Sequence, residues 1–345
     1  MVIETKAALT QTVAPPAMAT RRLGHANIYV NELSRSYKFY NMVCGFECIG
    51  REDSIKAVFL SNGNTHHDFA LVESDGAARV GMDNQRQDCD NYEGRAALNH
   101  IGWETVNQKE LIEAYRRGLE WGLEVKMSLF HGGSYALYLF DPDGNLHEFY
   151  ADARKDWRTI FTGPVNLGLV SRQWNPLDDA ENPMTDENWD PAPEWRHQDG
   201  GLVEARRAAR TVFYVTDVRK LLGFYQDVAG LEALFVAPDY SYAYLGGNAR
   251  QGPFDIALLE CGPDGENRPG YHHIACEVAD EAVLEASIRR LEQQGQPILR
   301  QVDDAQKRSF FLEDPDGLKL EFFVDRAADY SALGKVDPHL RPFFA

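Results

Sequence analysis

Three side chains in the first half of the chain could together bind a metal ion. His25 and His100 each open a segment of alternating residues, which predicts a strand, and Glu148 lies on a later predicted strand. Two imidazoles and one carboxylate on a rigid sheet would occupy one face of a cation and leave its other positions open. Non-haem Fe(II) oxygenases use this ligand set, which Mn(II) also fits. Taken singly, each of the three residues is more often structural.

An internal repeat predicts the elements that must position these residues. Four units, each with a strand, a helix and further strands, are expected near residues 22–73, 97–152, 207–260 and 270–325. In the first and third units the predicted helix ends near a glycine followed by a large apolar residue, which is a plausible helix stop. The first two units resemble the last two as a pair, so the chain is expected to form two domains of similar plan.

The second and fourth units correspond most closely. The offset of 173 residues between Glu148 and Glu321 also separates two Asp-Pro-Asp-Gly sequences, at 141–144 and 314–317. Proline presets φ and glycine tolerates a positive φ, so each sequence predicts a turn that joins two strands as a hairpin. Glu148 and Glu321 are therefore expected on the second strand of their hairpins.

The predicted fold class is α+β, with flanking and connecting segments around the two domains. In chain order we expect a loose N-terminal tail at 1–19, a catalytic metal-binding domain at 20–155, an acidic linker at 156–206 with several prolines and tryptophans, a second domain at 207–326 and a C-terminal tail at 327–345. Residues 172–200 carry eight acidic and two basic side chains, which is typical of a linker or a long excursion. Its three tryptophans favour packing on a domain surface.

The residues that lead up to Glu148 follow a specific pattern. His131 precedes Tyr138 by seven positions, and a proline and Gly144 then lead to Glu148. This pattern resembles the signature of type I extradiol ring-cleaving dioxygenases (catechol 2,3-dioxygenase-like) of the vicinal oxygen chelate superfamily. It departs from that signature only at Leu129, where the family has a small or branched residue. The resemblance implies four βαβββ modules paired into two vicinal oxygen chelate domains.

The resemblance also implies the roles of individual residues. His25, His100 and Glu148 match the Fe(II) ligands, while His131 and Tyr138 match residues that hydrogen-bond the bound catecholate. The segment 65–71 resembles the one that carries the family's acid–base histidine, and His67 matches that residue. The substrates would be a small aromatic diol and O2, and the product a ring-opened keto acid. His66 is expected to point to the other side of its strand, in a structural role.

The second half of the chain departs from the family pattern. At the positions that correspond to His25 and His67 it has Arg210 and Phe254, and only His273 remains with Glu321. Asp304 and Phe311 likewise replace the counterparts of His131 and Tyr138. We therefore predict a single metal per chain, in the N-terminal domain, although the familiar two-domain members hold it in the other one.

Composition excludes several classes of partner. A net charge of −18 argues against electrostatic nucleic-acid binding, and no stretch approaches the roughly 20 consecutive apolar residues of a membrane span. Five scattered cysteines and no apolar leader predict free thiols and a cytoplasmic location. The resemblance favours a homo-oligomer, because relatives commonly assemble.

Two other classes of function stay open from the sequence. One is another metal-dependent enzyme on the same scaffold, glyoxalase-like or a thiol transferase. A glyoxalase-type site would need a second glutamate on the last strand of the first unit, where the only one is Glu73, at the very end. The other is a non-catalytic small-molecule-binding relative. Trp103, Phe130 and Trp157 are candidates for an aromatic pocket, although a place in the core is the more frequent outcome.

Overall fold

The computed structural model describes residues 15–74, 96–168, 171–187, 194–262 and 267–345. The first half contains β1 (Arg22–Val30), α1 (Leu33–Lys38), η1 (Phe39–Val43), β2 (Cys48–Glu52), η2 (Asp53–Ile55), β3 (Ala57–Leu60), β4 (Phe69–Glu73), β5 (Ala97–Glu104), α2 (Gln108–Glu120), β6 (Met127–Phe130), β7 (Ser134–Phe140), β8 (Leu146–Asp152), η3 (Trp157–Thr159), β9 (Arg172–Gln173) and η4 (Pro176–Asp179). The second half contains β10 (Ala205–Val215), α3 (Val218–Gly223), η5 (Phe224–Val228), β11 (Glu232–Val236), β12 (Tyr242–Gly246), β13 (Ile256–Glu260), β14 (Gly270–Val278), α4 (Glu281–Gln293), β15 (Arg300–Asp303), β16 (Lys307–Glu313), β17 (Lys319–Asp325), η6 (Tyr330–Lys335) and α5 (Arg341–Phe344).

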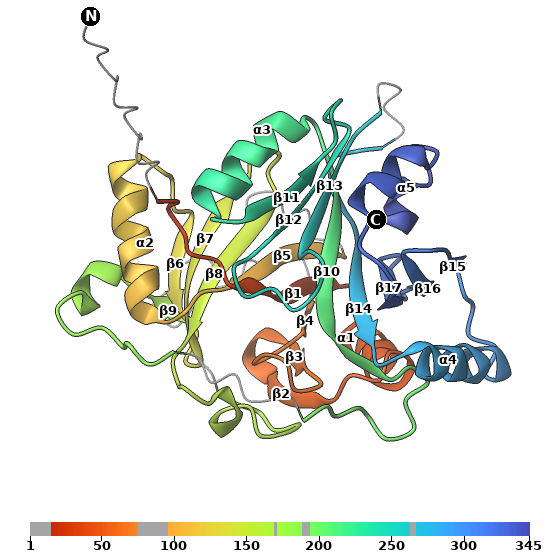
Figure 1. Cartoon of the computed structure of the whole chain (residues 1–345). Helices are drawn as coiled ribbons and strands as arrows, with labels where there is room; N and C mark the ends of the chain where they lie inside the picture. Colours follow the sequence, from red (N-terminus) through yellow and green to blue (C-terminus); the bar gives the residue numbers. More distant parts are fainter. Residues whose placement is uncertain (1–14, 75–95, 169–170, 188–193, 263–266) are drawn as a thin grey trace, which may run out of the picture.

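The strands form two mixed sheets, one from each half of the chain (Figure 1). Their strand orders are β2-β3-β4-β1-β5-β8-β7-β6-β9 and β11-β12-β13-β10-β14-β17-β16-β15. Within each sheet two βαβββ units meet at an antiparallel pair, β1 with β5 or β10 with β14, and each of these strands runs parallel to the last strand of its own unit. The four predicted modules and their pairing are confirmed.

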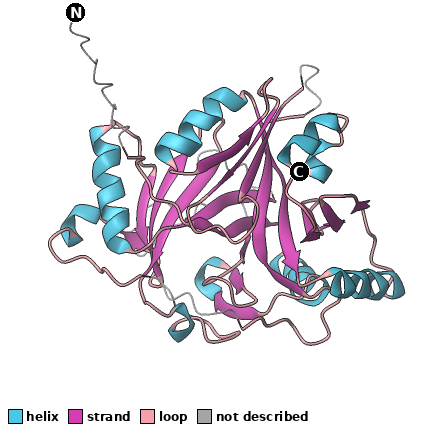
Figure 2. Ribbon diagram, in the orientation of Figure 1, coloured by secondary structure: helices cyan, strands magenta, loops and turns pink. Residues whose placement is uncertain are grey.

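The two faces of the first sheet have different surroundings, and β1 shows how the sequence sets them apart. Ala26, Ile28 and Val30 belong to a hydrophobic core that includes residues of both sheets. His25 and Tyr29 alternate with them and therefore point to the opposite face, which encloses the candidate site. Helices lie around the periphery of the sheets in Figure 2. The shared hydrophobic core includes residues of these helices as well as of both sheets.

The Asp-Pro-Asp-Gly sequences form the predicted hairpin turns, and they also connect the two halves. Gly144 and Gly317 have φ values of 85° and 91°, and the strands on either side of each turn pair antiparallel. Asp314 accepts a hydrogen bond from the hydroxyl of Tyr40 in the first unit, at 3.1 Å. The equivalent turn of the first half repeats the contact, because Asp141 accepts a hydrogen bond from the hydroxyl of Tyr225 at 3.2 Å. Each turn thus anchors the helix of the other half.

The flanking segments are packed more closely than the sequence suggested. In the segment that precedes β1, Ala17 and Met18 are fully buried and donate backbone hydrogen bonds to the carbonyls of residues 227 and 228. Residues 15–19 are therefore part of the fold instead of a loose tail, because they cover apolar surface of the second half; residues 1–14 lie outside the described ranges. Trp174 of the acidic segment is also buried, and β9 extends the first sheet beside β6.

The C-terminal segment lies against the inner face of the second sheet. Leu333 and Ala345 are buried there in a cluster with residues of β10, β12 and β13. Among the helices in the described parts of the chain, none has the length and apolar character that crossing a bilayer requires.

Candidate metal centre

His25, His100 and Glu148 come together on the inner face of the first sheet. The Nε2 atoms of His25 and His100 lie 2.8 and 2.9 Å from the same carboxylate oxygen, Oε2 of Glu148. The three side chains are at most 4 % exposed, and their ligand atoms all lie within 4.8 Å of one another. The three predicted ligands are therefore adjacent, although 123 residues separate the first from the last.

Strand pairing and one glycine explain why these side chains meet. β1, β5 and β8 are neighbours in the sheet, and the register sets His25 opposite Gly102, which in turn pairs with Glu148. A Cβ atom on Gly102 would lie 2.2 Å from Nε2 of His25, closer than real Cβ contacts ever are. Gly102 therefore provides the space that the His25 ring occupies next to Glu148.

The protonation states of this group suit a cation. Burial lowers the pKa of His25 to about 4, so its imidazole is neutral and keeps a lone pair near neutral pH. Burial alone would raise the pKa of Glu148, but the neighbouring His25 and His100 hold it well below its usual range. Nε2 of His100 is buried and makes no hydrogen bond of acceptable geometry. The neutral imidazole of His25, the ionised carboxylate of Glu148 and the unsatisfied ring nitrogen of His100 fit a divalent metal ion.

A cavity of about 130 Å³ opens beside these ligands, and His67 lines it. The His67 ring lies over that of His25, with 4.0 Å between the ring centroids. Both of its nitrogens are buried and without a hydrogen-bond partner, and burial holds its pKa well below the usual range. His67 is thus a neutral imidazole near pH 7, and neither of its nitrogens is hydrogen-bonded to another described residue.

His131 and Tyr138 form a hydrogen-bonded pair on another wall of the same cavity. Nε2 of His131 lies 2.8 Å from the Tyr138 hydroxyl, and its Nδ1 lies 2.7 Å from the hydroxyl of Ser171. Burial lowers the pKa of His131, whereas burial together with the charge of Glu148 raises that of Tyr138 well above its usual value. Both side chains are therefore neutral near pH 7, and both ring nitrogens of His131 are engaged by Tyr138 and Ser171.

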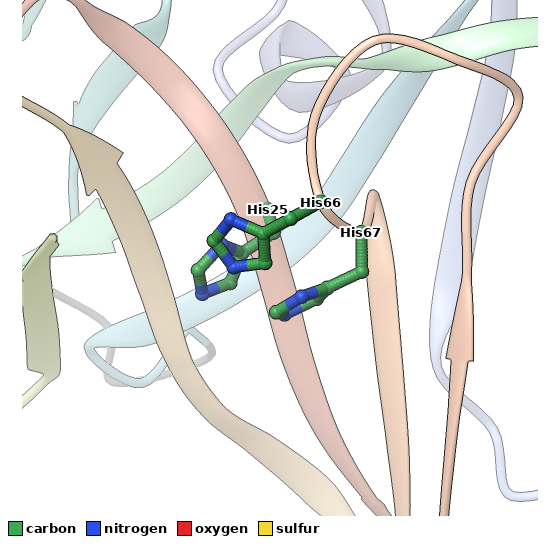
Figure 3. Close-up of side chains that lie close together, drawn as sticks. All are labelled: His25, His66 and His67. Atoms are coloured by element: carbon green, nitrogen blue, oxygen red, sulfur yellow. The ribbon is translucent and has the colours of Figure 1, made fainter. Parts of the chain in front are cut away.

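His66 lies at the site too, which corrects the expectation that it points away. Figure 3 shows the rings of His25, His66 and His67 gathered together, and their ligand atoms lie within 4.8 Å of one another. The reason is that residues 66 and 67 precede β4 in an irregular segment, where the alternation of a strand does not apply. Nδ1–H of His66 donates to Asp152 at 2.6 Å.

The His66–Asp152 pair is the part of the site that sequence reasoning missed. Burial alone would lower the pKa of His66, but the carboxylate of Asp152 raises it. The pair ties the segment that carries His67 to the end of β8, the strand that carries Glu148. The only sequence signal was the position of Asp152 four residues after Glu148, on the same side of a strand.

The aromatic walls of the cavity also differ from the sequence candidates. Phe59 and Phe161 line the cavity together with Tyr29. Trp103 is fully buried in the shared core, and Trp157 packs in a separate cluster, so the core interpretation of these two is confirmed. Phe130 packs against the shared core from its edge.

In the second half, an ammonium group touches the carboxylate that corresponds to Glu148. Nζ of Lys307 lies 2.6 Å from Oε1 of Glu321, and the two side chains are at most 2 % exposed. Nε2 of His273 lies 3.4 Å from the other carboxylate oxygen, and the Arg210 guanidinium lies 4.0 Å from it. Two fixed cations thus surround Glu321, and this arrangement disfavours a metal ion at that position.

Comparisons with known proteins agree with this architecture. The family profile of the Glyoxalase/Bleomycin resistance protein/Dioxygenase superfamily matches residues 22–149 and 207–322. The chain is 24 % identical over 313 residues to the catechol-2,3-dioxygenase of Bacillus subtilis (strain 168), which covers 88 % of this chain and 97 % of the relative.

Two solved structures show the same fold. The 2,3-dioxygenase LapB from Pseudomonas sp. KL28 superposes with a TM-score of 0.62 at 15 % identity, covering 92 % of this chain and 96 % of that one. A Mn(II)-bound glyoxalase from Novosphingobium aromaticivorans gives a TM-score of 0.59 at 14 % identity, covering 90 % and 83 %.

Proposed function

Because the chain belongs to the Glyoxalase/Bleomycin resistance protein/Dioxygenase superfamily, we propose that it is an extradiol dioxygenase that opens the aromatic ring of a catechol with O2. The observation that carries the proposal is the cluster of His25, His100 and Glu148 beside a cavity that His67 lines with two unpaired ring nitrogens. The similarity of this chain in sequence to a catechol-2,3-dioxygenase, over most of both chains, supports the same activity.

In this proposal His25, His100 and Glu148 hold a non-haem Fe(II), and Mn(II) fits the same donors. The metal, when bound, would act as a Lewis acid and lower the pKa of the diol. It would also offer open positions at which the two reactants meet. Both oxygen atoms of O2 enter the product, and one carbon–carbon bond of the ring next to the diol is broken.

His67 is proposed to move the proton of the substrate. Its depressed pKa keeps the ring neutral, so one of the unpaired nitrogens can accept the proton of a catechol hydroxyl. The resulting imidazolium would then return that proton to an oxygen atom when the ring opens. The rings of Phe59 and His25 pack against the His67 ring, with centroid distances of 5.3 and 4.0 Å. In the proposal these two rings hold His67 in place and exclude water from it.

Tyr138 and His131 are proposed to orient the diol. The raised pKa of Tyr138 keeps its hydroxyl protonated, so it can donate a hydrogen bond to negative charge that develops on a substrate oxygen. Its partner His131 is in turn fixed by Ser171. We further propose a cytoplasmic enzyme that acts as a homo-oligomer on a free small molecule, without nucleic-acid or membrane partners.

A glyoxalase-type isomerase is the second candidate, because a Mn(II)-bound glyoxalase shares the fold. The residue that such a site would need, Glu73, is committed elsewhere: its carboxylate pairs with Lys56 at 2.7 Å and accepts from the backbone of Leu33 at 3.0 Å. His67 lines the cavity instead. This difference favours oxygen chemistry over isomerisation.

One experiment separates the two candidates. Protein reconstituted with Fe(II) or Mn(II) without oxygen is mixed with 4-methylcatechol and air, and in parallel with methylglyoxal and glutathione. The proposal expects uptake of one O2 per catechol and a yellow ring-opened product, with no isomerisation of the hemithioacetal. Isomerisation without oxygen uptake would establish the glyoxalase alternative instead.

A further inference from the structure

Glu52 is a buried acid that the proposed chemistry does not use. It ends β2 and lines the cavity, although its side chain is only 4 % exposed. Oε1 accepts hydrogen bonds from the hydroxyl and the backbone N–H of Ser54, at 2.6 and 3.3 Å, as a cap of η2. Oε2 is buried and has no hydrogen-bond partner. One oxygen of this carboxylate therefore has a structural role as a helix cap, whereas the other lacks a hydrogen-bond partner.

An unsatisfied carboxylate oxygen in a protein cavity is costly unless something that binds there pairs with it. Leaving a buried acceptor without a partner costs about 1–3 kcal/mol, and more for a charged group. A second acceptor in the same cavity is in the same condition, because Oδ1 of Asn27 is buried and has no partner. Two unpaired acceptors call for a ligand that carries hydrogen-bond donors.

The strand register places Glu52 at the far end of the cavity from the metal ligands. Glu52 pairs with Ala57, which pairs with Val72, which pairs with Tyr29 of β1. Tyr29 is four residues beyond His25, which corresponds to ~13 Å along a strand at about 3.3 Å per residue. A diol held near His25 would therefore reach Glu52 only through a substituent that extends away from the ring.

The rest of the lining limits what this substituent can be. Among the described residues that line the cavity there is no lysine or arginine to pair with a carboxylate on the ligand. The cavity volume of about 130 Å³ suits one aromatic ring, since an apolar cavity of about 150 Å³ holds one benzene. Its apolar walls include Phe59, Val72 and Met127. A single ring with a short donor-bearing chain matches this lining, whereas a carboxylate on the ligand would meet no cation there.

We propose that the substrate is a single-ring catechol whose short substituent ends in an ammonium or hydroxyl group, and that Glu52 binds this group through Oε2. The inference rests on the proposed function for the ring chemistry and adds the substrate class. A charge-assisted hydrogen bond to Glu52 makes an aminoalkyl catechol a better substrate than its alkyl isostere.

The test compares three catechols and one ligand that cannot be cleaved. Fe(II)-loaded protein is assayed with 4-(2-aminoethyl)catechol, 4-ethylcatechol and 3,4-dihydroxyphenylacetate, and metal-free protein is titrated with tyramine by calorimetry. We expect kcat/KM for the aminoethyl compound to exceed that for the ethyl compound by about 10- to 100-fold, with the carboxylate poorest. Glu52→Gln, which retains an oxygen for Ser54, should reduce this ratio to near one and weaken tyramine binding by a similar factor.

Asp53→Asn is the matched control, because it removes a neighbouring carboxylate that is exposed and pairs with Arg51. It should leave the ratio and the tyramine affinity unchanged. Equal tyramine affinity in wild type and Glu52→Gln, or a carboxylated catechol as the best substrate, would overturn the inference. Tyramine binding that depends on Glu52, in a protein that cleaves no catechol, would instead support recognition by Glu52 and refute only the proposed ring cleavage.

Discussion

Substitution of Gly102 by alanine tests whether the His25 ring is held where a metal would need it. The new Cβ would lie 2.2 Å from both Cε1 and Nε2 of that ring, whereas real contacts of this kind are not under 3.0 Å. The ring must therefore move by close to an ångström from the place that it occupies beside Glu148. A displacement of about 1 Å at a reacting centre can cost ~100-fold in rate, and a disturbed ligand about 10- to 100-fold in metal affinity.

Alanine itself is compatible with this position of the strand. In the second half Ala275 pairs with Arg210 just as Gly102 pairs with His25, and it is fully buried. Competition against a chelator should show the loss of Fe(II) affinity in Gly102→Ala. Denaturant unfolding of metal-free protein should show a destabilisation of about 1–3 kcal/mol from overpacking. Most of it should disappear when His25→Ala is added. Wild-type metal affinity in Gly102→Ala, or an equal cost in both backgrounds, would refute this reasoning.

Three further predictions concern other parts of the molecule. His67→Ala should keep its metal content and lose about 10²- to 10⁴-fold in kcat; catechol cleavage at the wild-type rate would remove the proposed proton-transfer role. Lys307→Met should lower the free energy of unfolding by about 3–5 kcal/mol because it leaves Glu321 buried without its closest cation, and Glu321→Leu in the same chain should restore most of it in urea titrations. Burial raises the pKa of Asp255 to about 6, so the folded state keeps a proton that the unfolded chain releases above about pH 4. The stabilisation that this bound proton gives the folded state is complete below about pH 4 and is lost as the pH rises through about 6. The free energy of unfolding of wild type relative to that of Asp255→Asn should therefore fall by about 2–3 kcal/mol between pH 4 and 7. A difference that does not change with pH would contradict this.

The sequence was informative where function depends on regular elements. The predicted ligands His25, His100 and Glu148 lie on strands, and the family resemblance, carried by the residue pattern that leads to Glu148, implied that they share a site. The resemblance also implied that His131 and Tyr138 act together, and they meet because both belong to the hairpin of β6 and β7. The repeat offset predicted the equivalent elements of the second half.

Prediction failed where irregular backbone or distant packing decides the geometry. The segment before β4 turns His66 into the site, which strand alternation could not indicate. In the second half Lys307 lies at the position that the repeat offset matches with Ser134. The sequence shows this difference but not that the long side chain reaches Glu321. The contacts of Ala17 and Met18 with the second half join segments more than 200 residues apart, and no local pattern encodes them.

The most direct test of the central claim is the fate of labelled oxygen. Fe(II)-reconstituted protein is mixed with one equivalent of a single-ring catechol under ¹⁸O₂, and the product is analysed at once by mass spectrometry. The proposed mechanism expects a ring-opened product that carries two ¹⁸O atoms, formed by wild type and not by Glu148→Ala. Unchanged catechol, or a product without oxygen from the gas, would contradict the assignment of this cavity to ring cleavage.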